Sequence, residues 1–216
     1  MYRRLLAAWL LVLLELSAAG AAEVETQIYK TTPQGKLQMH LHFPSDWKAD
    51  DQRPAIVFFF GGGWRTGRVS QFERQADYFA SRGMVAARAD YRVRTRHGVS
   101  PDRCVEDAKS AVRYLRANAK KLGIDPDRIV ASGGSAGGHI AACTGTTPGL
   151  DADDEDAEIS SRPNAMVLFN PVLKFTGYES LMSRIGDDEK LGHEISPTLH
   201  VQKETPPAII LFGDAD

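Results

Sequence analysis

Six consecutive apolar residues, Ala55 to Phe60, run directly into three glycines. An uninterrupted apolar run of this length is typical of a strand buried on both faces, and such strands occur in parallel sheets covered by helices. Further strand-like runs alternate with helical patterns, which predicts one α/β domain with a mostly parallel, doubly wound sheet. We expect strands at residues 84–89, 128–132, 165–169 and 208–212, and helices at residues 71–82, 101–122 and 136–144.

The two ends of the predicted sheet differ in character. Residues 27–30 and 36–43 flank Gly35 and are expected to form an antiparallel hairpin that opens the domain. The last predicted strand, 208–212, is apolar and is followed by only four residues. Because further elements usually cover such a strand, we expect the chain to be a C-terminally truncated fragment that lacks the last helix and strand of the sheet.

The long helix predicted at residues 101–122 carries clear end signals. Ser100 stands at the N-cap position, and Pro101 is the first helical residue, where its missing N–H costs nothing. Gly123 follows the last turn and is expected to end the helix.

The N-terminus has the pattern of a secretory signal peptide. Arg3 and Arg4 precede an apolar run at residues 5–16, and small residues follow up to Ala22. The apolar run is shorter than the roughly 20 residues of a membrane span, although an uncleaved anchor is the alternative. We therefore expect a signal peptide at residues 1–22, a mature domain at residues 23–216, no stable membrane span after cleavage, and a secreted or periplasmic location.

Other conspicuous residues have structural explanations. Cys104 and Cys143 lie in predicted helices and are expected to be buried free thiols. The arginines between residues 88 and 96 could meet an acidic substrate, but ion pairs such as one with Asp107 are the favoured interpretation. The acidic run at residues 151–158 lacks the ligand spacing of a calcium loop and is expected to be solvated.

Composition also excludes some partners. The net charge of −2 gives no electrostatic reason to expect a nucleic-acid partner. The sequence has neither a cluster of metal ligands nor a dinucleotide-binding fingerprint. We therefore expect no metal and no organic cofactor.

A candidate nucleophile lies between a predicted strand and a predicted helix. Gly133-Gly-Ser135-Ala-Gly137 fits G-x-S-x-G, in which the serine occupies a sharp turn and needs small neighbours. The helix that follows favours negative charge at its N-terminus. A plain glycine-rich turn or a phosphate-binding loop is the alternative, and the strand-turn-helix context favours Ser135 as a nucleophile.

The glycine run after the first buried strand is a candidate oxyanion hole. Glycines allow backbone N–H groups to approach a reacting centre, and we expect donors from Gly62 and Gly63, joined by the N–H of Ala136. A flexible surface loop is the alternative. Trp64 follows the run and is a candidate wall of the substrate pocket, although core filling explains it equally well.

A third candidate site residue lies at the end of the chain. The strand 208–212 is followed by Gly213 and acidic residues, which places a carboxylate at the same edge of the sheet as Ser135. Such a carboxylate could orient a catalytic histidine. Asp214 and Asp216 are both candidates on this ground.

These motifs together resemble the α/β-hydrolase superfamily, in the branch of small exported esterases and lipases that includes hormone-sensitive-lipase-like and feruloyl or acetyl-xylan esterases. The similarity extends from the first hairpin to the last residue. The matching stretches are Gly61–Trp64, Asp90–Arg92, Gly123–Ile129, Gly134–His139, Ser196-Pro197, Pro206-Pro207 and the final Gly213-x-x-Asp216. The resemblance implies Ser135 as nucleophile, Asp216 as triad acid, and Gly62, Gly63 and Ala136 as oxyanion donors.

The chain departs from this family at two points. Phe60 stands where the family usually has a histidine before the glycines, which bears on the stability of the loop. The family's catalytic histidine follows the triad acid, and we expect it beyond residue 216. We interpret all six histidines of this sequence as hydrogen-bonded surface or supporting residues, and we expect residues 1–216 alone to be inactive.

The resemblance implies a serine hydrolase that cleaves carboxylic esters through an acyl-enzyme, acting on a small-molecule or polysaccharide-linked ester. A serine peptidase or a lactonase on the same fold is an alternative. A non-catalytic binding protein that lacks the base histidine is another, although such a protein needs neither Ser135 nor the glycine run.

Overall fold

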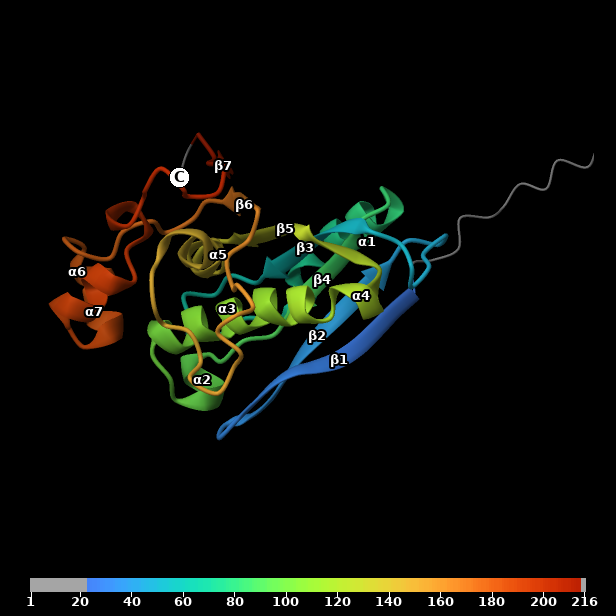
Figure 1. The fold of residues 1–216 in the computed structure, drawn as a ribbon. Helices are drawn as coiled ribbons and strands as arrows, with labels where there is room; N and C mark the ends of the chain where they lie inside the picture. The colour runs from blue at the N-terminus through green and yellow to red at the C-terminus, as the bar shows by residue number, and fades with distance from the viewer. Residues whose placement is uncertain (1–22, 215–216) are drawn as a thin grey trace, which may run out of the picture.

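The computed structural model describes residues 23–214, with a seven-stranded sheet at its centre (Figure 1). The expected signal peptide and Asp216 lie outside these residues. The strand order is β1-β2-β4-β3-β5-β6-β7, in which β1, β2 and β4 pair antiparallel and the other neighbours pair parallel. The strands are β1 Glu23–Thr32, β2 Gly35–Phe43, β3 Arg53–Phe59, β4 Val85–Ala89, β5 Ile124–Gly134, β6 Ala165–Phe169 and β7 Ala208–Leu211.

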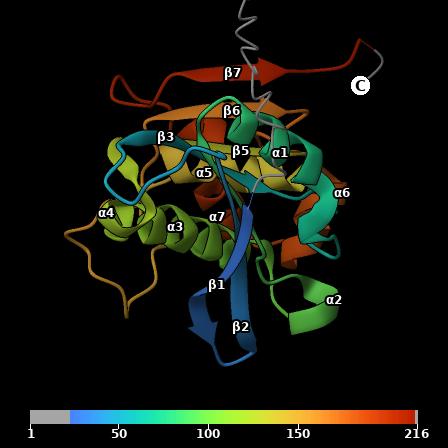
Figure 2. The same ribbon diagram turned by 90° about the vertical axis from the view of Figure 1, so that its right-hand side faces the viewer.

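Helices cover both faces of the central strands, and Figure 2 shows α1 and α3 on opposite sides of them. In β3, Val57 and Phe59 face the core with α3 and α5, whereas Phe58 packs on Phe72 beside α1. The helical elements are η1 Val69–Phe72, α1 Glu73–Ser81, α2 Arg94–His97, α3 Pro101–Ala117, α4 Ala119–Leu122, α5 Ala136–Thr146, α6 Glu179–Met182, η2 Ser183–Ile185, α7 Glu189–Glu194 and η3 Pro197–Leu199. This arrangement confirms the predicted α/β-hydrolase class, including its antiparallel N-terminal hairpin.

The predicted helix at residues 101–122 is two helices, α3 and α4, separated at Asn118. Asn118 leaves helical geometry at φ −100° and ψ 12°, and its side-chain amide donates to the carbonyl of Tyr114 at 2.9 Å. The Asn118 backbone N–H donates to the same carbonyl at 3.0 Å, so the helical bond is kept and the side chain adds a second bond at the end of α3. Ser100 is the N-cap residue and Pro101 the first helical residue, as expected, although the Ser100 hydroxyl donates to the Asp102 carboxylate and accepts no bond from the backbone.

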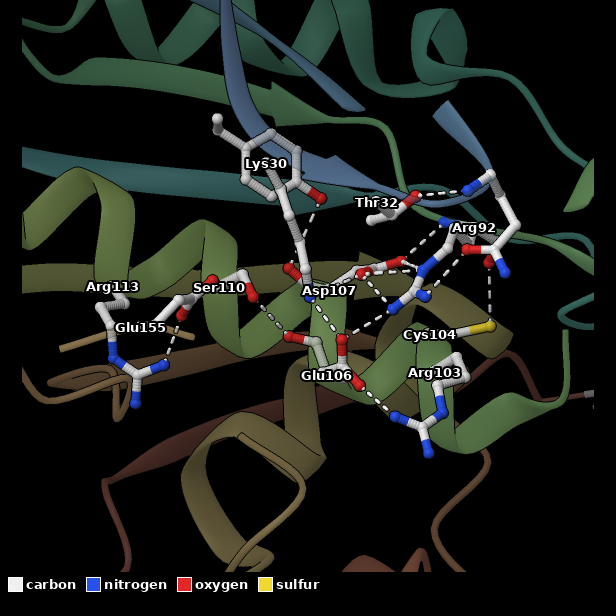
Figure 3. A network of polar contacts seen from close by, with 12 residues as sticks. Lys30, Thr32, Arg92, Arg103, Cys104, Glu106, Asp107, Ser110, Arg113 and Glu155 are labelled. Carbon is white, nitrogen blue, oxygen red and sulfur yellow. Dashed lines mark hydrogen bonds and ion pairs between the residues drawn. The ribbon is translucent and has the colours of Figure 1, made fainter. Parts of the chain in front are cut away.

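A buried polar network fixes α3 to the loop after β4 (Figure 3). The Arg92 guanidinium donates to both carboxylate oxygens of the fully buried Asp107, and the backbone N–H of Arg92 donates to Asp107 at 2.9 Å. Lys30 of β1 bridges Glu106 and Asp107 at 2.7 and 2.9 Å. The expected ion pair between this arginine run and Asp107 is therefore confirmed.

The acidic run at residues 151–158 is less solvated than expected. Its half-buried Asp151 pairs with Lys109 of α3 at 2.9 Å and also with Arg113, which pairs with Glu155 as well. These pairs dock the first half of the run on α3.

The expectation of free thiols is confirmed, because Cys104 and Cys143 are buried and unpaired. Within residues 23–214, no helix is both long and apolar enough to cross a membrane.

Candidate active site

Ser135 lies at the tight turn between β5 and α5 and is exposed to solvent. Its φ of 55° and ψ of −119° fall in a region that residues with a Cβ rarely adopt. The Ser135 N–H donates to the carbonyl of Phe169 in β6 at 2.9 Å, and its carbonyl accepts from the His139 N–H in the first turn of α5. The turn is therefore held by bonds on both sides while the hydroxyl stays accessible.

The glycines around Ser135 are required by close backbone packing. A Cβ added at Gly137 would lie 2.1 Å from the carbonyl oxygen of Phe59, at the end of β3. A Cβ at Gly133 would lie 2.6 Å from the same oxygen. Both distances are far inside van der Waals contact, so the G-x-S-x-G spacing follows from the approach of α5 to β3.

The glycine run after β3 lies beside Ser135. A Cβ added at Gly61 would lie 3.4 Å from the Cβ of Ser135. The Gly61 N–H donates to the side-chain oxygen of Gln71 at 2.5 Å, so it is not free for a substrate. Sequence reasoning missed Gln71, since a polar residue at the start of a predicted helix carries no signal of this contact.

Gly62 and Gly63 have backbone conformations that suit them as donors. Their φ values are 136° and 61°, and the Gly62 carbonyl accepts the N–H groups of Arg65 and Thr66, both at 3.2 Å. Since a trans peptide points its N–H opposite to its carbonyl, these bonds turn the Gly63 N–H away from the loop interior. Neither the Gly62 nor the Gly63 N–H has an acceptor among residues 23–214.

Ala136 is the first residue of α5, so its N–H has no partner inside the helix. It follows Ser135 directly and begins the helix whose N-terminus carries a partial positive charge. The three expected donors therefore lie on two elements, the start of α5 directly after Ser135 and the loop after β3, whose first glycine, Gly61, lies beside Ser135.

The loop begins at Phe60, at the position where the esterases and lipases that the sequence resembles usually have a histidine. Phe60 is buried and stacks on Tyr91, with ring centroids 4.1 Å apart. The Tyr91 hydroxyl donates to the Phe60 carbonyl at 2.6 Å. This aromatic pair anchors the start of the loop without a histidine.

Trp64 is 3% exposed and lies under the loop rather than on its surface. Its ring contacts Phe175 with centroids 4.9 Å apart, and its indole N–H donates to Nδ1 of His139 at 3.1 Å. This burial favours the core-filling interpretation of Trp64 over that of a pocket wall.

His139 has no nitrogen left for Ser135. With Nδ1 accepting from Trp64, the proton is on Nε2, which donates to the Ile195 carbonyl at 2.7 Å. Burial lowers the pKa of His139 to about 4, although the bond to Ile195 acts in the opposite direction. His139 is therefore a neutral connector between α5, the loop after β3 and the segment before β7.

Four of the other five histidines have hydrogen-bonded rings, as expected, whereas the ring of His193 makes no hydrogen bond within residues 23–214 and lies against the ring of His200. His42 is buried between Asp77 and Arg88 at 2.8 Å from each, and its pKa is lowered by burial and by the charge of Arg88. The remaining contacts are His40 with Thr26, His97 with the Val93 N–H, and His200 with the His193 carbonyl.

The candidate acids follow β7. This strand is parallel to β6, so its carboxyl end lies at the same edge of the sheet as Ser135. Asp214 is exposed directly beyond it, whereas Asp216, the preferred acid, lies outside the described residues. Over the described part of the chain, no group of three or more histidine, cysteine or acidic side chains is arranged to hold a metal.

Known proteins share this arrangement. The sequence profile of the BD-FAE family matches residues 39–216. A probable isoprenylcysteine alpha-carbonyl methylesterase of Arabidopsis thaliana is 28% identical over 88% of this chain, which spans only 43% of that protein. Endo-1,4-beta-xylanase B of Butyrivibrio fibrisolvens is 31% identical over 77% of this chain and 28% of its own length.

Solved structures agree with the sequence comparison. Apo esterase 2 of Thermogutta terrifontis superposes with a TM-score of 0.82 and 50% identity, covering 89% of this chain and 71% of that one. The same esterase is known phosphorylated by paraoxon and with butyrate bound. The profile match, the sheet order and the serine turn agree, and the chain belongs to the BD-FAE family, a carboxylesterase branch of the α/β-hydrolases.

Proposed function

We propose that the protein hydrolyses carboxylic esters through an acyl-enzyme formed on Ser135. The observation that carries the proposal is the exposed serine in a strained turn beside the glycine loop, in which the N–H groups of Gly62 and Gly63 have no acceptor among residues 23–214. Strained conformations of this kind persist where the surrounding structure holds them, and they are concentrated at active sites.

In the proposed reaction, the Ser135 oxygen attacks the ester carbonyl and passes its proton to a base. The carbonyl oxygen becomes an oxyanion, which accepts hydrogen bonds from the N–H groups of Gly62, Gly63 and Ala136. Collapse of the tetrahedral intermediate expels the alcohol and leaves an acyl group on Ser135, which water then removes. His139 is not the base, because both of its ring nitrogens are engaged. Asp216 remains our assignment for the acid that orients the base.

We propose short-chain acyl esters as the substrate class, with a carbohydrate-linked alcohol as the favoured leaving group. The butyrate bound to the related Thermogutta esterase supports the short acyl chain. The similarity to a xylanase supports the carbohydrate link. We further propose that residues 1–22 direct export and are removed, so that sequencing the exported protein should find Glu23 at its N-terminus.

The test of the proposed reaction uses the complete polypeptide that the gene encodes, with p-nitrophenyl acetate and p-nitrophenyl butyrate as substrates. Ser135→Ala is expected to lower kcat at least about 1,000-fold, as loss of a catalytic serine does in other hydrolases. Ser81→Ala removes a hydroxyl from the exposed end of α1 and should leave kcat unchanged.

A covalent label gives an independent test of whether Ser135 is the nucleophile. A fluorophosphonate should modify the wild-type protein on the peptide that contains Ser135, and Ser135→Ala should prevent it, as the paraoxon adduct of the related esterase suggests. A wild-type protein that neither turns over these esters nor takes the label would refute the proposal and favour a binding protein. Turnover of peptides or lactones in preference to open-chain esters would favour the alternative hydrolases.

A further inference from the structure

The oxyanion loop contains three consecutive residues with positive φ. Gly62, Gly63 and Trp64 have φ values of 136°, 61° and 58°. For a residue with a Cβ such as Trp64, this conformation costs about 1–3 kcal/mol and persists only when several contacts hold it. The glycines have no such steric restriction, so their peptides can turn unless a partner fixes them. The contacts of each peptide therefore decide where its N–H points.

Most of these contacts come from nearby in the sequence. Gln71 holds the Gly61 N–H, the Arg65 and Thr66 N–H groups hold the Gly62 carbonyl, and the Arg94 N–H holds the Trp64 carbonyl at 2.9 Å. The Gly63 carbonyl is different, because its partner lies 121 residues away in the segment between β6 and β7.

That partner is Arg184, a half-buried residue of η2. Its Nη1 donates to the Gly63 carbonyl at 3.0 Å, and its Nε donates to the Ser180 carbonyl at 3.2 Å. The guanidinium carbon lies 5.7 Å from the centre of the Trp64 ring, in the range of a cation–π contact. One planar group thus contacts two consecutive residues of the loop.

The segment that carries Arg184 is itself attached to the nucleophile helix. The side chains of Met182 and Ile185 are buried on either side of Arg184. Further along, the Ile195 carbonyl accepts from His139 of α5. Figure 1 shows α6 and α7 beyond the carboxyl ends of the central strands. Arg184 therefore contacts the loop from a segment that is itself fixed to α5.

We propose that Arg184 is a positioning residue for the oxyanion hole. Its bond to the Gly63 carbonyl fixes the Gly63–Trp64 peptide, while the Arg65 and Thr66 N–H groups fix the Gly62–Gly63 peptide, so that Gly63 is held from both sides with its own N–H toward the developing oxyanion. This inference rests on the proposed esterase function. Arg184 touches neither the acyl group nor Ser135 in this role. Its effect passes through Gly63 and Trp64, so it acts on the transition state, where negative charge develops on the carbonyl oxygen, more than on the bound ester.

The test compares three variants of the complete polypeptide. Arg184→Met keeps the length and the apolar contact of the side chain but removes its N–H donors, and Arg184→Lys restores one donor without the planar fork. Lys190→Met removes a positive charge from the same segment, where Lys190 is 86% exposed and makes only a 3.7 Å pair with Glu194. It controls for the general effect of charge. Each variant is assayed for kcat and KM with p-nitrophenyl acetate and for inhibition by a trifluoromethyl ketone, which forms a tetrahedral oxyanion on the serine.

Arg184→Met is expected to lower kcat by about 10- to 100-fold, somewhat less than the loss of a direct oxyanion donor, with KM changed less than threefold. The inhibition constant of the ketone should rise by a similar factor. Arg184→Lys should recover part of both, and Lys190→Met should match the wild type within twofold.

Other outcomes overturn the inference. Unchanged kcat in Arg184→Met would show that the loop holds its geometry alone, and reduced kcat without weaker ketone binding would show a general structural role. If Arg184→Met does not fold, Arg184→Lys decides by the same two measurements. An inactive wild-type protein would overturn the esterase function itself, whereas an active wild type, an inactive Ser135→Ala and a fully active Arg184→Met would overturn only the role of Arg184.

Discussion

Replacing Ser135 by glycine should stabilise the domain relative to replacing it by alanine. Both variants lack the hydroxyl, so the difference between them isolates the Cβ. The backbone at this position, φ 55° and ψ −119°, is that of the first central residue of a type II′ turn, which glycine dominates. Because the residue is exposed and its two hydrogen bonds are made by the backbone, glycine loses no buried contact.

The size of the effect follows from two opposing terms. Relief of the strained backbone contributes about 1–3 kcal/mol, and the greater freedom of glycine in the unfolded chain offsets about 0.5–1 kcal/mol. Ser135→Gly should therefore exceed Ser135→Ala by about 1 kcal/mol in free energy of unfolding, or about 2–4 °C in Tm for a domain of this size. Neither variant should hydrolyse esters.

Urea unfolding followed by tryptophan fluorescence measures the difference. Ser110, in the interior of α3, provides a control of opposite sign, because its backbone is helical and its side chain is buried, so glycine there should be less stable than alanine by at least about 1 kcal/mol. The two sites should thus give opposite signs. If Ser135→Gly were no more stable than Ser135→Ala while Ser110 behaved as expected, the serine turn would not be strained and the argument from strain to function would fail.

Three further predictions concern the supports of the site. Gly137→Ala should cost about 3 kcal/mol or prevent folding, because its Cβ would lie 2.1 Å from the Phe59 carbonyl oxygen; a change below about 1 kcal/mol in thermal unfolding would contradict this. Asp107→Asn should cost about 3–5 kcal/mol in urea unfolding by leaving the buried Arg92 charge without its carboxylate, and a nearly neutral result would contradict the role of this pair. Burial lowers the pKa of His139 from 6.5 to about 4, so its contribution is present above pH 6.5 and is lost as the pH falls toward 4. His139→Gln should flatten the pH dependence of stability across that window by about 3 kcal/mol, and parallel profiles would exclude His139 as its cause.

The sequence by itself determined the sheet, the serine turn and the glycine loop. Each of these depends on local rules that a single stretch of chain obeys. An apolar run such as Ala55 to Phe60 has to be buried on both faces, and a strand that turns sharply into a helix at Ser135 requires glycine at Gly133 and Gly137. Such steric requirements act over a few residues, so their pattern is visible before the chain folds.

Only the tertiary structure decided which residues support the site. Three contacts show this: Arg184 with the Gly63 carbonyl, Gln71 with the Gly61 N–H, and the side chain of Trp64 with that of His139. A hydrogen bond between positions 121 residues apart leaves no periodic trace in the sequence, because any arginine on an exposed helical turn has the same local pattern. Its partner is set by how the segment after β6 packs on α5, and that packing exists only in the folded chain.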